Sequence, residues 1–332
     1  MTIKKQEIAI IGSGISGISI GNMLNHIANV TIFEKSRGIG GRISTRYIED
    51  FEFDHGAQFF TIKTDGFQKF MQPLIDNGII DVWDARFVEI NKNKVIHKKK
   101  WNLEYPHYVG TPRMNAICKH LASKVNVNLK VKVQTIERID NNKWKLSDSN
   151  NKELGKFDWV ISTIPSHQSK TLLPKEFAYH KSLKEIKMLG CYALMLGFKN
   201  KLYLGWDAAL VKNSNISWIS NNSSKPKRNL LNTIVVLTTN KWADENIESD
   251  LEYVKSEMIK TLSGIIDYCG NELVESNIHR WKYANIEKNN KYKYLLDQNN
   301  KLAVIGDWCI ESRIEGAFMS ADALYSKLVS II

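Results

Sequence analysis

The sequence predicts an α/β fold in which one parallel-sheet domain takes its segments from both ends of the chain. Residues 8–42 combine an apolar strand, a glycine-rich turn, a helical stretch and a second strand. Near the other end, the apolar strand Leu302–Ile305 precedes Gly306-Asp307 and a closing helix. From about residue 181 onward, short apolar segments are typical of antiparallel strands. We therefore expect an inserted α+β domain built on a mainly antiparallel sheet.

The first element is a strand at Ile8–Ile11 that runs into a glycine-rich turn, Gly12-Ser13-Gly14-Ile15-Ser16-Gly17. Gly12 lets the chain turn tightly, Gly14 lets a pyrophosphate approach the backbone, and Gly17 lets the next helix pack on the sheet. The N-terminus of that helix offers free N–H groups and the positive end of its dipole to phosphates. The spacing predicts a Rossmann-type dinucleotide site.

The second strand, Val30–Phe33, ends in Glu34, which lies 22 residues after Gly12. A carboxylate at this place can accept both hydroxyls of an adenosine ribose. A lone glycine motif is a weak signal, whereas one framed by two strands, a helix and this acid is strong.

A second glycine-rich turn, from Arg37 to Arg42, follows the acid directly. A nicotinamide dehydrogenase needs no such turn, but FAD lies extended, so a second loop must pass close to its pyrophosphate and ribityl chain. Arg42 can pair with phosphate oxygens, while Gly40 and Gly41 leave no side chains in the path. The alternative is a flexible surface turn with two solvated arginines. We favour FAD as the cofactor.

The middle of the chain alternates between strand and helix patterns. Residues 157–164 are a buried-strand pattern that Pro165 ends, and 66–80 have helical spacing interrupted by Pro73. A polar and aromatic stretch fills 81–108. Further strands are expected at 51–54, 127–138, 143–149, 188–198, 216–220, 231–238 and 277–283, the second and third forming a hairpin, and helices at 115–124, 245–264 and 316–331.

These patterns predict a discontinuous domain organisation. We assign 1–60, 105–165 and 295–332 to the FAD-binding domain, and 61–104 and 166–294 to the substrate domain.

The C-terminal segment predicts a second contact with the cofactor. Asp307 follows an apolar strand, where a carboxylate faces the ligand crevice and can accept a ribityl hydroxyl. Residues 313–317 open the last helix, whose N-terminus could stabilise negative charge on reduced flavin. The alternative is an ordinary turn and a packing helix.

Composition and charge exclude several classes of protein. The chain of 332 residues is globular in composition, with 43% hydrophobic and 24% charged residues. No apolar stretch is long enough to span a membrane, and the N-terminus enters the first strand with no signal peptide. The net charge of +11 comes from lysines spread along the chain without a nucleic-acid motif. Its one tight cluster, Lys98-Lys99-Lys100, is interpreted as a solvated loop.

The four cysteines show no spacing typical of a disulfide or a metal site, namely Cys118, Cys191, Cys269 and Cys309. We expect buried thiols in a reducing cytoplasm, and no metal, nucleic acid or membrane as a partner. FAD should be held without a covalent bond, because no His or Cys is clearly placed for attachment. Cys309 is the one candidate for such a bond.

Over nearly its whole length the chain resembles the bacterial renalase-like FAD-dependent oxidoreductases, a branch of the flavin amine-oxidase superfamily. The most specific matching stretches are FDHGAQFFT at 53–61, SSKP at 223–226 and GDWCIESRIEGAFMSA at 306–321. Others are IAIIGSGISG, FEKSRGIGGRISTR, YVGTPRMNAI, ISWISNN and HRWKYA. One departure is Asn285-Ile286, where the pattern has a proline nearby.

The resemblance implies a set of site residues. Those implied to contact FAD are Gly12, Ser13, Gly14, Gly17, Glu34, Lys35, Gly41, Arg42, Val133, Thr163, Asp307, Glu315 and Ala317. Ala57, Gln58 and Phe59 are implied to lie beside the isoalloxazine, where Gln58 offers both a donor and an acceptor. Gln58, Phe59 and Trp281 are the candidates for catalytic positioning at the flavin face.

Two further features were open to more than one interpretation. His55 could be catalytic or a satisfied structural histidine. Five aromatic residues could line a flat pocket or belong to the core, namely Trp206, Trp218, Trp281, Tyr283 and Trp308.

The resemblance also implies an activity, namely the oxidation of 2- or 6-dihydro isomers of nicotinamide dinucleotides, with dioxygen as electron acceptor and H2O2 as product. Hydride transfer needs an oriented donor more than an acid or base, and the sequence offers no obvious general-base constellation. The alternative is a flavin amine oxidase, or a related FAD dehydrogenase, of a small amine or apolar substrate. A non-catalytic FAD-bound protein is a third class, against which the intact glycine turns and Asp307 argue.

Overall fold

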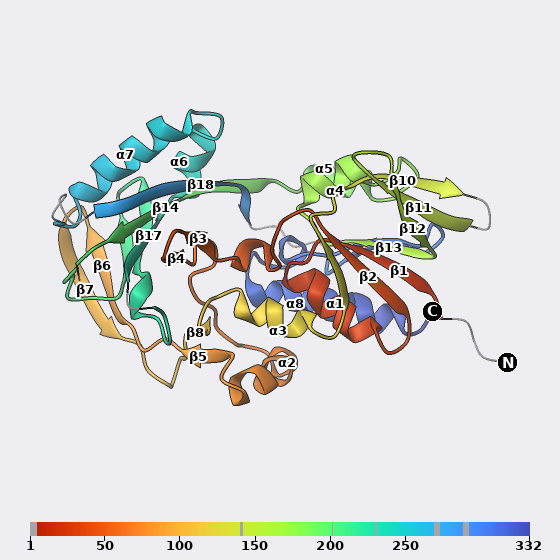
Figure 1. Ribbon diagram of the computed structural model, residues 1–332, viewed down its shortest axis with the longest axis horizontal. Coiled ribbons are helices and arrows are strands. Elements are labelled where there is room, and N and C mark those ends of the chain that lie inside the picture. The colour runs from red at the N-terminus through yellow and green to blue at the C-terminus, as the bar shows by residue number, and fades with distance from the viewer. Residues whose placement is uncertain (1–4, 140–141, 201, 230, 269–272, 288–291) are drawn as a thin grey trace. The chain divides into compact units, whose positions relative to one another are not determined.

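The computed structural model describes residues 5–332 apart from 140–141, 201, 230, 269–272 and 288–291 (Figure 1). The chain divides into two compact units, each assembled from separate segments. Unit 1 comprises Met1–Gly41, Cys118–Met188 and Ile286–Ile332, and unit 2 comprises Arg42–Ile117 and Leu189–Asn285.

The boundaries of these units differ from the predicted ones. Residues 42–60 and 105–117 belong to unit 2, and 166–188 and 286–294 belong to unit 1. Packing explains the first of these differences, because Phe51 and Phe53 are buried against the sheet of unit 2. The segment 166–188 instead contributes Leu173, Phe177 and Leu183 to the core of unit 1.

Unit 1 is built on a six-stranded sheet in the order β19-β20-β13-β1-β2-β9. All neighbouring strands run parallel except β19 and β20. The central strands are nearly continuous runs of apolar residues, as expected for a sheet covered on both faces. The strands are β1 Glu7–Ile11, β2 Asn29–Glu34, β9 Asn126–Leu129, β13 Trp159–Ser162, β19 Leu295–Asp297 and β20 Leu302–Val304.

Two helices that come from opposite ends of the chain pack together in unit 1, namely α1 Ile15–Leu24 and α8 Ile314–Leu328 (Figure 1). The shorter helices α4 Ser166–Leu172 and α5 His180–Glu185 follow β13, and α3 Ala116–Ala122 precedes β9. None of the helices in the described part of the chain is both long and apolar enough to cross a membrane.

A three-stranded antiparallel sheet completes unit 1, with β10 Val133–Ile139, β11 Lys143–Asp148 and β12 Glu153–Phe157. The predicted hairpin is confirmed for β10 and β11, although the turn residue Asp140 lies outside the described residues. The predicted strand over 127–138 is wrong, because its first part is the separate strand β9, which pairs with β2. Lys130, with φ +59°, marks the break between them.

Unit 2 contains a seven-stranded sheet in the order β18-β14-β17-β16-β15-β6-β7. Strand β17 runs antiparallel to β14 and β16, β15 runs antiparallel to β16, and β6 runs antiparallel to β7, whereas β15 and β6 are parallel; this agrees with a mainly antiparallel sheet. The strands are β6 Arg86–Asn91, β7 Lys94–Lys100, β14 Met188–Phe198, β15 Ala208–Lys212, β16 Ile216–Asn221, β17 Asn232–Thr238 and β18 Leu273–Ile286.

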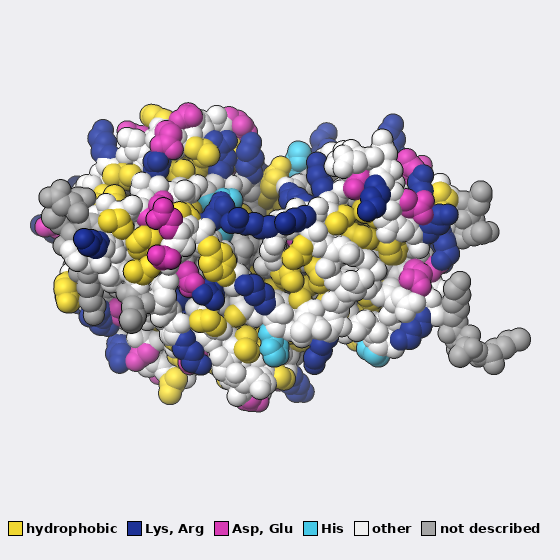
Figure 2. Space-filling model, in the orientation of Figure 1, with side chains coloured by type: hydrophobic (Ala, Val, Ile, Leu, Met, Phe, Trp, Pro, Cys, Tyr) yellow, Lys and Arg dark blue, Asp and Glu magenta, His cyan; other side chains and the backbone are white. Residues whose placement is uncertain are grey.

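Three of these strands, β6, β7 and β15, were not predicted from the sequence. The lysine cluster at 98–100 forms part of β7 rather than a loop, and every residue of β7 is exposed at the edge of the sheet. Charged side chains on an edge strand hinder pairing with other chains. Figure 2 shows Lys and Arg side chains distributed over the visible faces of both units, interspersed with Asp and Glu.

One face of the unit 2 sheet is covered by α6 Asn240–Glu245 and α7 Leu251–Ser263, which bury Ala243, Val254, Met258 and Leu262. The helix predicted over 245–264 is confirmed in its main part as α7, but it begins at Leu251, and residue 245 is the end of the separate helix α6. The carboxylate of Asp250 accepts hydrogen bonds from the backbone N–H groups of Glu252 and Tyr253, so a new helix begins there.

The remaining elements of unit 2 lie outside the large sheet. They are β3 Arg46–Ile48, β4 Phe51–Phe53, α2 Asp65–Asp76, β5 Ile80–Val82 and β8 Tyr108–Gly110. Helix α2 keeps Pro73 inside it and ends before residue 80, because Ile80 pairs with Gly110 as the start of β5. Side chains of β4 pack on the sheet face opposite to α7, against Met195 and Val235.

Candidate functional site

The first glycine turn of unit 1 is built for close approach to its backbone. Gly12 has φ +106°, and its N–H donates to the carbonyl of Phe33 over 2.9 Å. A Cβ on Gly17 would lie 2.0 Å from the carbonyl oxygen of Gly12, so α1 can begin here only with glycine. A Cβ on Gly14 would meet nothing within 4 Å. The turn therefore leaves open space beside the N-terminus of a ten-residue helix.

The carboxylate of Glu34 lies at the carboxyl end of β2 and is only 7% exposed. One oxygen accepts hydrogen bonds from the N–H and the hydroxyl of Ser13, each at 2.9 Å. The other accepts from the N–H of Ser36 at 2.8 Å. These donors hold the acid against the first turn, while its neighbour Lys35 is exposed.

The second glycine turn lies against the first. The N–H of Gly40 donates to the carbonyl of Ser13 at 3.1 Å. Gly41 has φ +53°, and a Cβ there would lie 3.5 Å from the Cα of Gly14. The two turns that the sequence predicted to flank a pyrophosphate are thus in contact.

The C-terminal segment of unit 1 reaches the same turns. The hydroxyl of Ser16 donates to the carbonyl of Ala317 at 3.0 Å, which brings the start of α8 to the start of α1. The hydroxyl of Thr163 donates to the carbonyl of Gly12 at 3.0 Å. The carboxyl-bearing residues Asp307 and Glu315 are 6% and 3% exposed.

Two further residues of unit 1, Val133 and Cys309, were considered as contacts or attachment points for the cofactor. Val133 belongs to the apolar core of unit 1, so only its backbone is suited to a polar contact. Burial raises the pKa of the Cys309 thiol to about 12, and the residue is 3% exposed. A thiol in that state is a poor nucleophile. Cys118 and Cys191 are also free and buried, whereas Cys269 lies outside the described residues.

Unit 1 as a whole fits a dinucleotide. Two glycine turns in contact, a buried acid after β2 and a helix N-terminus can hold the ribose and pyrophosphate of FAD. Across the described ranges of the chain, no group of three or more His, Cys, Asp or Glu residues is placed to hold a metal ion.

In unit 2 the residues Asp54 to Phe59 form a turn, here called the 54–59 turn, beside the sheet face opposite to α7. The N–H of Ala57 donates to the carbonyl of Arg42 at 2.9 Å. A Cβ on Gly56 would lie 1.9 Å from that same carbonyl oxygen, so the backbone of the turn is pressed against Arg42. The Arg42 guanidinium donates to the carbonyl of Ala284 at 3.0 Å.

The side-chain amide of Gln58 is bound at both ends within unit 2. Its nitrogen donates to the carbonyls of Asp54 and Gly56 at 2.6 and 2.8 Å. Its oxygen accepts from the hydroxyl of Ser220 at 2.7 Å and from the ammonium of Lys225 at 3.4 Å. The amide predicted to face a ligand therefore holds the turn in shape.

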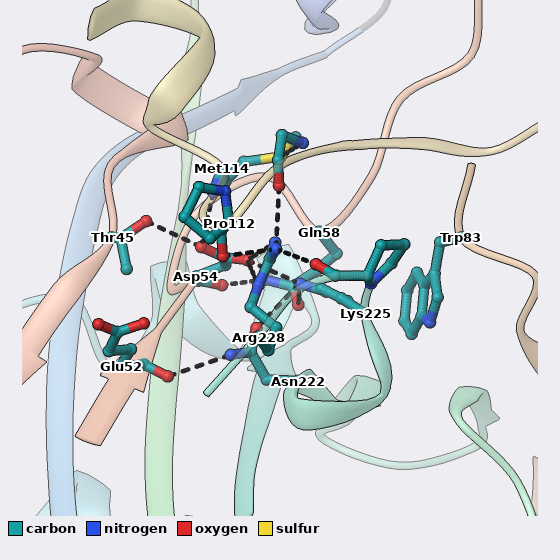
Figure 3. A network of polar contacts seen from close by, with 12 residues as sticks. Thr45, Glu52, Asp54, Gln58, Trp83, Pro112, Met114, Asn222, Lys225 and Arg228 are labelled. Atoms are coloured by element: carbon teal, nitrogen blue, oxygen red, sulfur yellow. Dashed lines mark hydrogen bonds and ion pairs between the residues drawn. The ribbon is translucent and has the colours of Figure 1, made fainter. Parts of the chain in front are cut away.

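A buried ionic network lies directly behind the turn (Figure 3). The Asp54 carboxylate accepts from Arg228 at 2.6 Å and from Lys225 at 3.4 Å, and also from Thr45 and the N–H of Met114. Burial by itself would raise the pKa of Asp54, but the two cations lower it to about 2.

No role was predicted from the sequence for Asp54, Lys225 or Arg228. The first two lie inside the stretches FDHGAQFFT and SSKP that carried the family resemblance, and the third lies two residues after SSKP. The sequence signal that could have identified these residues was the charge of Asp54 and Lys225 within those stretches, and of Arg228 shortly after them.

Aromatic rings surround Phe59 on the same side of the sheet. The Phe59 ring centroid lies 4.9 Å from those of Trp101 and His107 and 5.5 Å from that of Trp218. Trp101 and His107 stack with centroids 3.6 Å apart and an interplanar angle of 7°. Phe87 stacks with both Trp101 and Trp218.

His55 and Trp281 form a second ring contact at the 54–59 turn. Trp281, on β18, stacks on His55 with centroids 5.1 Å apart and donates its indole N–H to the carbonyl of His55 at 2.9 Å. Burial, together with His279 and Arg46, lowers the pKa of His55 to about 3, so its ring is neutral. Its Nδ1 has no hydrogen-bond partner, so the ring is not fully satisfied.

The single aromatic pocket suggested by five residues is not formed. Trp206 belongs to the core between the unit 2 sheet and α7. Trp308 belongs to the core of unit 1 and donates to the carbonyl of Ile164 at 3.2 Å. Both fill hydrophobic cores, whereas Trp218 and Trp281 take part in the ring contacts described above.

Comparisons with known proteins agree with this architecture. Residues 10–74 match the family of NAD(P)-binding Rossmann-like domains, and residues 85–323 match the family of flavin containing amine oxidoreductases. A solved protein from Exiguobacterium sp. 255-15, assigned as a protoporphyrinogen oxidase, is similar with a TM-score of 0.73 and 11% identity over 99% of each chain. Two variants of a putrescine oxidase give TM-scores of 0.72 and 0.70, at 10% and 11% identity, over 98% of this chain and 99% of theirs.

These findings confirm two predictions. The fold is α/β, with a Rossmann-like domain and a sheet-rich second domain, and the cofactor is FAD.

Proposed function

Since this chain belongs to the family of flavin containing amine oxidoreductases, we propose that it oxidises 2- or 6-dihydro isomers of nicotinamide dinucleotides. One dihydronicotinamide, one dioxygen and one proton would give one nicotinamide cation and one H2O2. FAD, when bound, supplies the two-electron acceptor for this chemistry.

One observation carries the choice of this branch of the family. The stretches 53–61 and 216–226 bear the resemblance to renalase-like enzymes, and they are far apart in the sequence. In unit 2 they are joined through Gln58, which accepts hydrogen bonds from Ser220 and Lys225. Residues that distinguish the branch thus form one network at the 54–59 turn, as expected if they act on a shared site.

The titratable groups of the turn also favour a hydride donor as substrate. Asp54 is paired with Arg228 and has a pKa of about 2, and His55 is neutral with a pKa of about 3. At neutral pH neither group is suited to accept a proton from a substrate. Hydride transfer depends instead on how the donor is oriented.

Different residues of the chain would bind the cofactor and orient the substrate. The glycine turns and Glu34 would bind the cofactor's pyrophosphate and ribose. Ala57 and Phe59 would lie at the isoalloxazine, and the rings around Phe59 offer apolar faces to a flat nicotinamide. Gln58 and Trp281 would act as positioning residues that hold the turn.

We also propose that FAD is bound without a covalent link, because the one candidate thiol, Cys309, is buried and protonated. Acid precipitation should then release the flavin into the supernatant, whereas a yellow pellet would overturn this assignment. The remaining proposals are a cytoplasmic location, a dinucleotide substrate, dioxygen as acceptor, and neither nucleic acid nor membrane as a partner.

A flavin-bleaching screen without oxygen tests the substrate. We expect 2- or 6-dihydronicotinamide dinucleotide to bleach the flavin quickly, and the 4-dihydro cofactor and simple amines to leave it oxidised. Oxygen should then restore the oxidised spectrum and produce H2O2.

The alternative substrate is a small amine, which the family description and the similarity to putrescine oxidase favour. Rapid bleaching by a primary or secondary amine, with none by either dihydro isomer, would replace the dinucleotide proposal with that one.

A further inference from the structure

The network behind the 54–59 turn contains unequal numbers of buried charges. The side chains of Lys225, Arg228 and Asp54 are 0%, 1% and 1% exposed. Two of them are cations and one is an anion. With all three ionised, the cluster carries one net positive charge that is out of contact with solvent.

The two cations do not share the carboxylate equally. Arg228 approaches Asp54 to 2.6 Å, whereas the Lys225 ammonium lies 3.4 Å away. Lys225 makes a shorter contact, 3.0 Å, with the side-chain oxygen of Asn222. It is also 3.4 Å from the Gln58 oxygen and 5.4 Å from the centre of the Trp83 ring. Amide dipoles and a ring face stabilise a cation, but they do not cancel its charge.

The other ionisable groups near this network do not supply the missing negative charge. Glu52 forms its own ion pair with Arg113. His55 is neutral. Asp54 and Arg228 are the groups that act electrostatically on Lys225 itself, and burial lowers the pKa of Lys225 to about 8. Burial first, and the neighbouring charge of Arg228 second, therefore destabilise the protonated form of the lysine.

A buried charge without a matching partner is costly to the folded state. The unmatched positive charge of this cluster would stabilise a site where negative charge develops during the reaction. Transfer of a hydride to neutral flavin moves two electrons and one proton, so the reduced flavin gains one negative charge. Fixed positive charge close to that flavin would stabilise the charge as it forms.

We propose that Lys225 is a positioning residue with an electrostatic role, which places net positive charge behind the 54–59 turn and thereby favours reduced over oxidised flavin. The same side chain orients Gln58 and so fixes the turn. The proposal rests on the proposed function in one respect, that Ala57 and Phe59 lie at the isoalloxazine.

The test compares the midpoint potential of bound flavin in wild type, Lys225→Met and Lys227→Met, measured by equilibrium with redox dyes at pH 7. Methionine keeps the length of the side chain and removes its charge. Lys227 is the matched control, because it lies two residues away and is exposed. We expect Lys225→Met to lower the equilibrium constant for reduction about tenfold, or about 30 mV for two electrons, and Lys227→Met to leave it unchanged. Equal potentials in all three proteins would overturn the proposal.

A second measurement needs no variant at position 225. As pH rises through the pKa of Lys225, the cluster becomes neutral, so the wild-type potential should fall more steeply above about pH 8. A constant slope from pH 7 to 9 would overturn the proposal even if Lys225→Met does not fold. Redox dyes require no substrate. A failed substrate screen would therefore count against the proposed function, whereas a failed potential measurement would count against the role of Lys225.

Discussion

The glycine turns of unit 1 and the 54–59 turn of unit 2 are built by different means. In unit 1 the conformation of the turns is set mainly by the backbone, since Gly12 and Gly41 have positive φ and Gly17 has no room for a side chain. In unit 2 the turn is held by side chains from distant segments, above all Gln58 and Lys225. The glycine turns of unit 1 are therefore determined by the local sequence, whereas the 54–59 turn depends on the tertiary fold. The two should therefore fail in different ways when they are mutated.

The largest effect is expected for Asp54→Asn, which leaves two buried cations without a carboxylate. Removing one partner of a buried pair costs about 3–5 kcal/mol of unfolding free energy. Urea unfolding at pH 7 measures this cost. Asp50→Asn, at an exposed acid of the same segment, is the control and should change little.

The Asp54 carboxylate should also make the stability of the folded protein depend on pH. The pKa of Asp54 in the folded protein, about 2, lies below its ordinary value of 3.8. Its contribution to stability is therefore complete above about pH 4 and is lost as the pH falls toward 2. Asp54→Asn should flatten this part of the acid-unfolding curve, and an unchanged curve would show that the ion pairs do not support the turn.

Glu34→Arg tests the buried acid that the unit 1 site places after β2. The substitution replaces an acceptor by a donor next to Ser13 and Ser36. Hydrogen bonds to a charged group contribute about 1.5–3 kcal/mol, so FAD should bind about 100-fold more weakly. The flavin-to-protein absorbance ratio after desalting measures this loss. Glu176→Arg, at an exposed acid of unit 1, should keep its flavin, and full occupancy in Glu34→Arg would remove this residue from the site.

A pair of glycine variants separates folding from binding in unit 1. Gly17→Ala puts a methyl group 2.0 Å from the carbonyl of Gly12, and overpacking of this kind costs about 1–3 kcal/mol or more. Gly14→Ala meets no atom within 4 Å. We expect Gly17→Ala to lower the melting temperature of the apoprotein, and Gly14→Ala to weaken only FAD binding. Equal melting temperatures would contradict the backbone account of this turn.

The difference between locally determined and tertiary structure also explains which elements could be predicted from the sequence alone. The strand, turn, helix and acid of unit 1 follow one another within residues 8–42, and the structure places them as predicted. The strands β6, β7 and β15 were missed because their residues mix exposed charges with apolar side chains, and pairing with neighbours decides their conformation. The helix over 245–264 was predicted as one because its apolar spacing continues across the break that Asp250 introduces.

The site in unit 2 could be predicted only in part. The family resemblance drew attention to Gln58 and Phe59, but the sequence could not show that the Gln58 amide is bound at both ends. That finding required the position of Ser220, which is 162 residues away along the chain. Nor could spacing alone show that Lys225 is buried, since lysine is usually exposed.

Gln58→Ala is expected to have the mildest effect of these variants, and it tests the geometry of the 54–59 turn directly. The variant loses the bonds to the carbonyls of Asp54 and Gly56, so the turn should become looser while the glycine turns of unit 1 stay intact. A displacement of about 1 Å can cost 100-fold in rate. We therefore expect flavin reduction to slow roughly 10- to 100-fold, with the affinity for FAD changed only a few-fold. Stopped-flow reduction and FAD titration measure the two quantities.

The control for this variant is Gln68→Ala, whose side chain bonds only to Gln72 along α2 among the contacts described. Its reduction rate should match that of wild type. If Gln58→Ala instead weakened FAD binding as much as reduction, its amide would act on the cofactor's affinity and not on the geometry of the reaction. The contrast between a backbone-built cradle and a side-chain-built turn would then no longer hold, because both would serve to bind FAD.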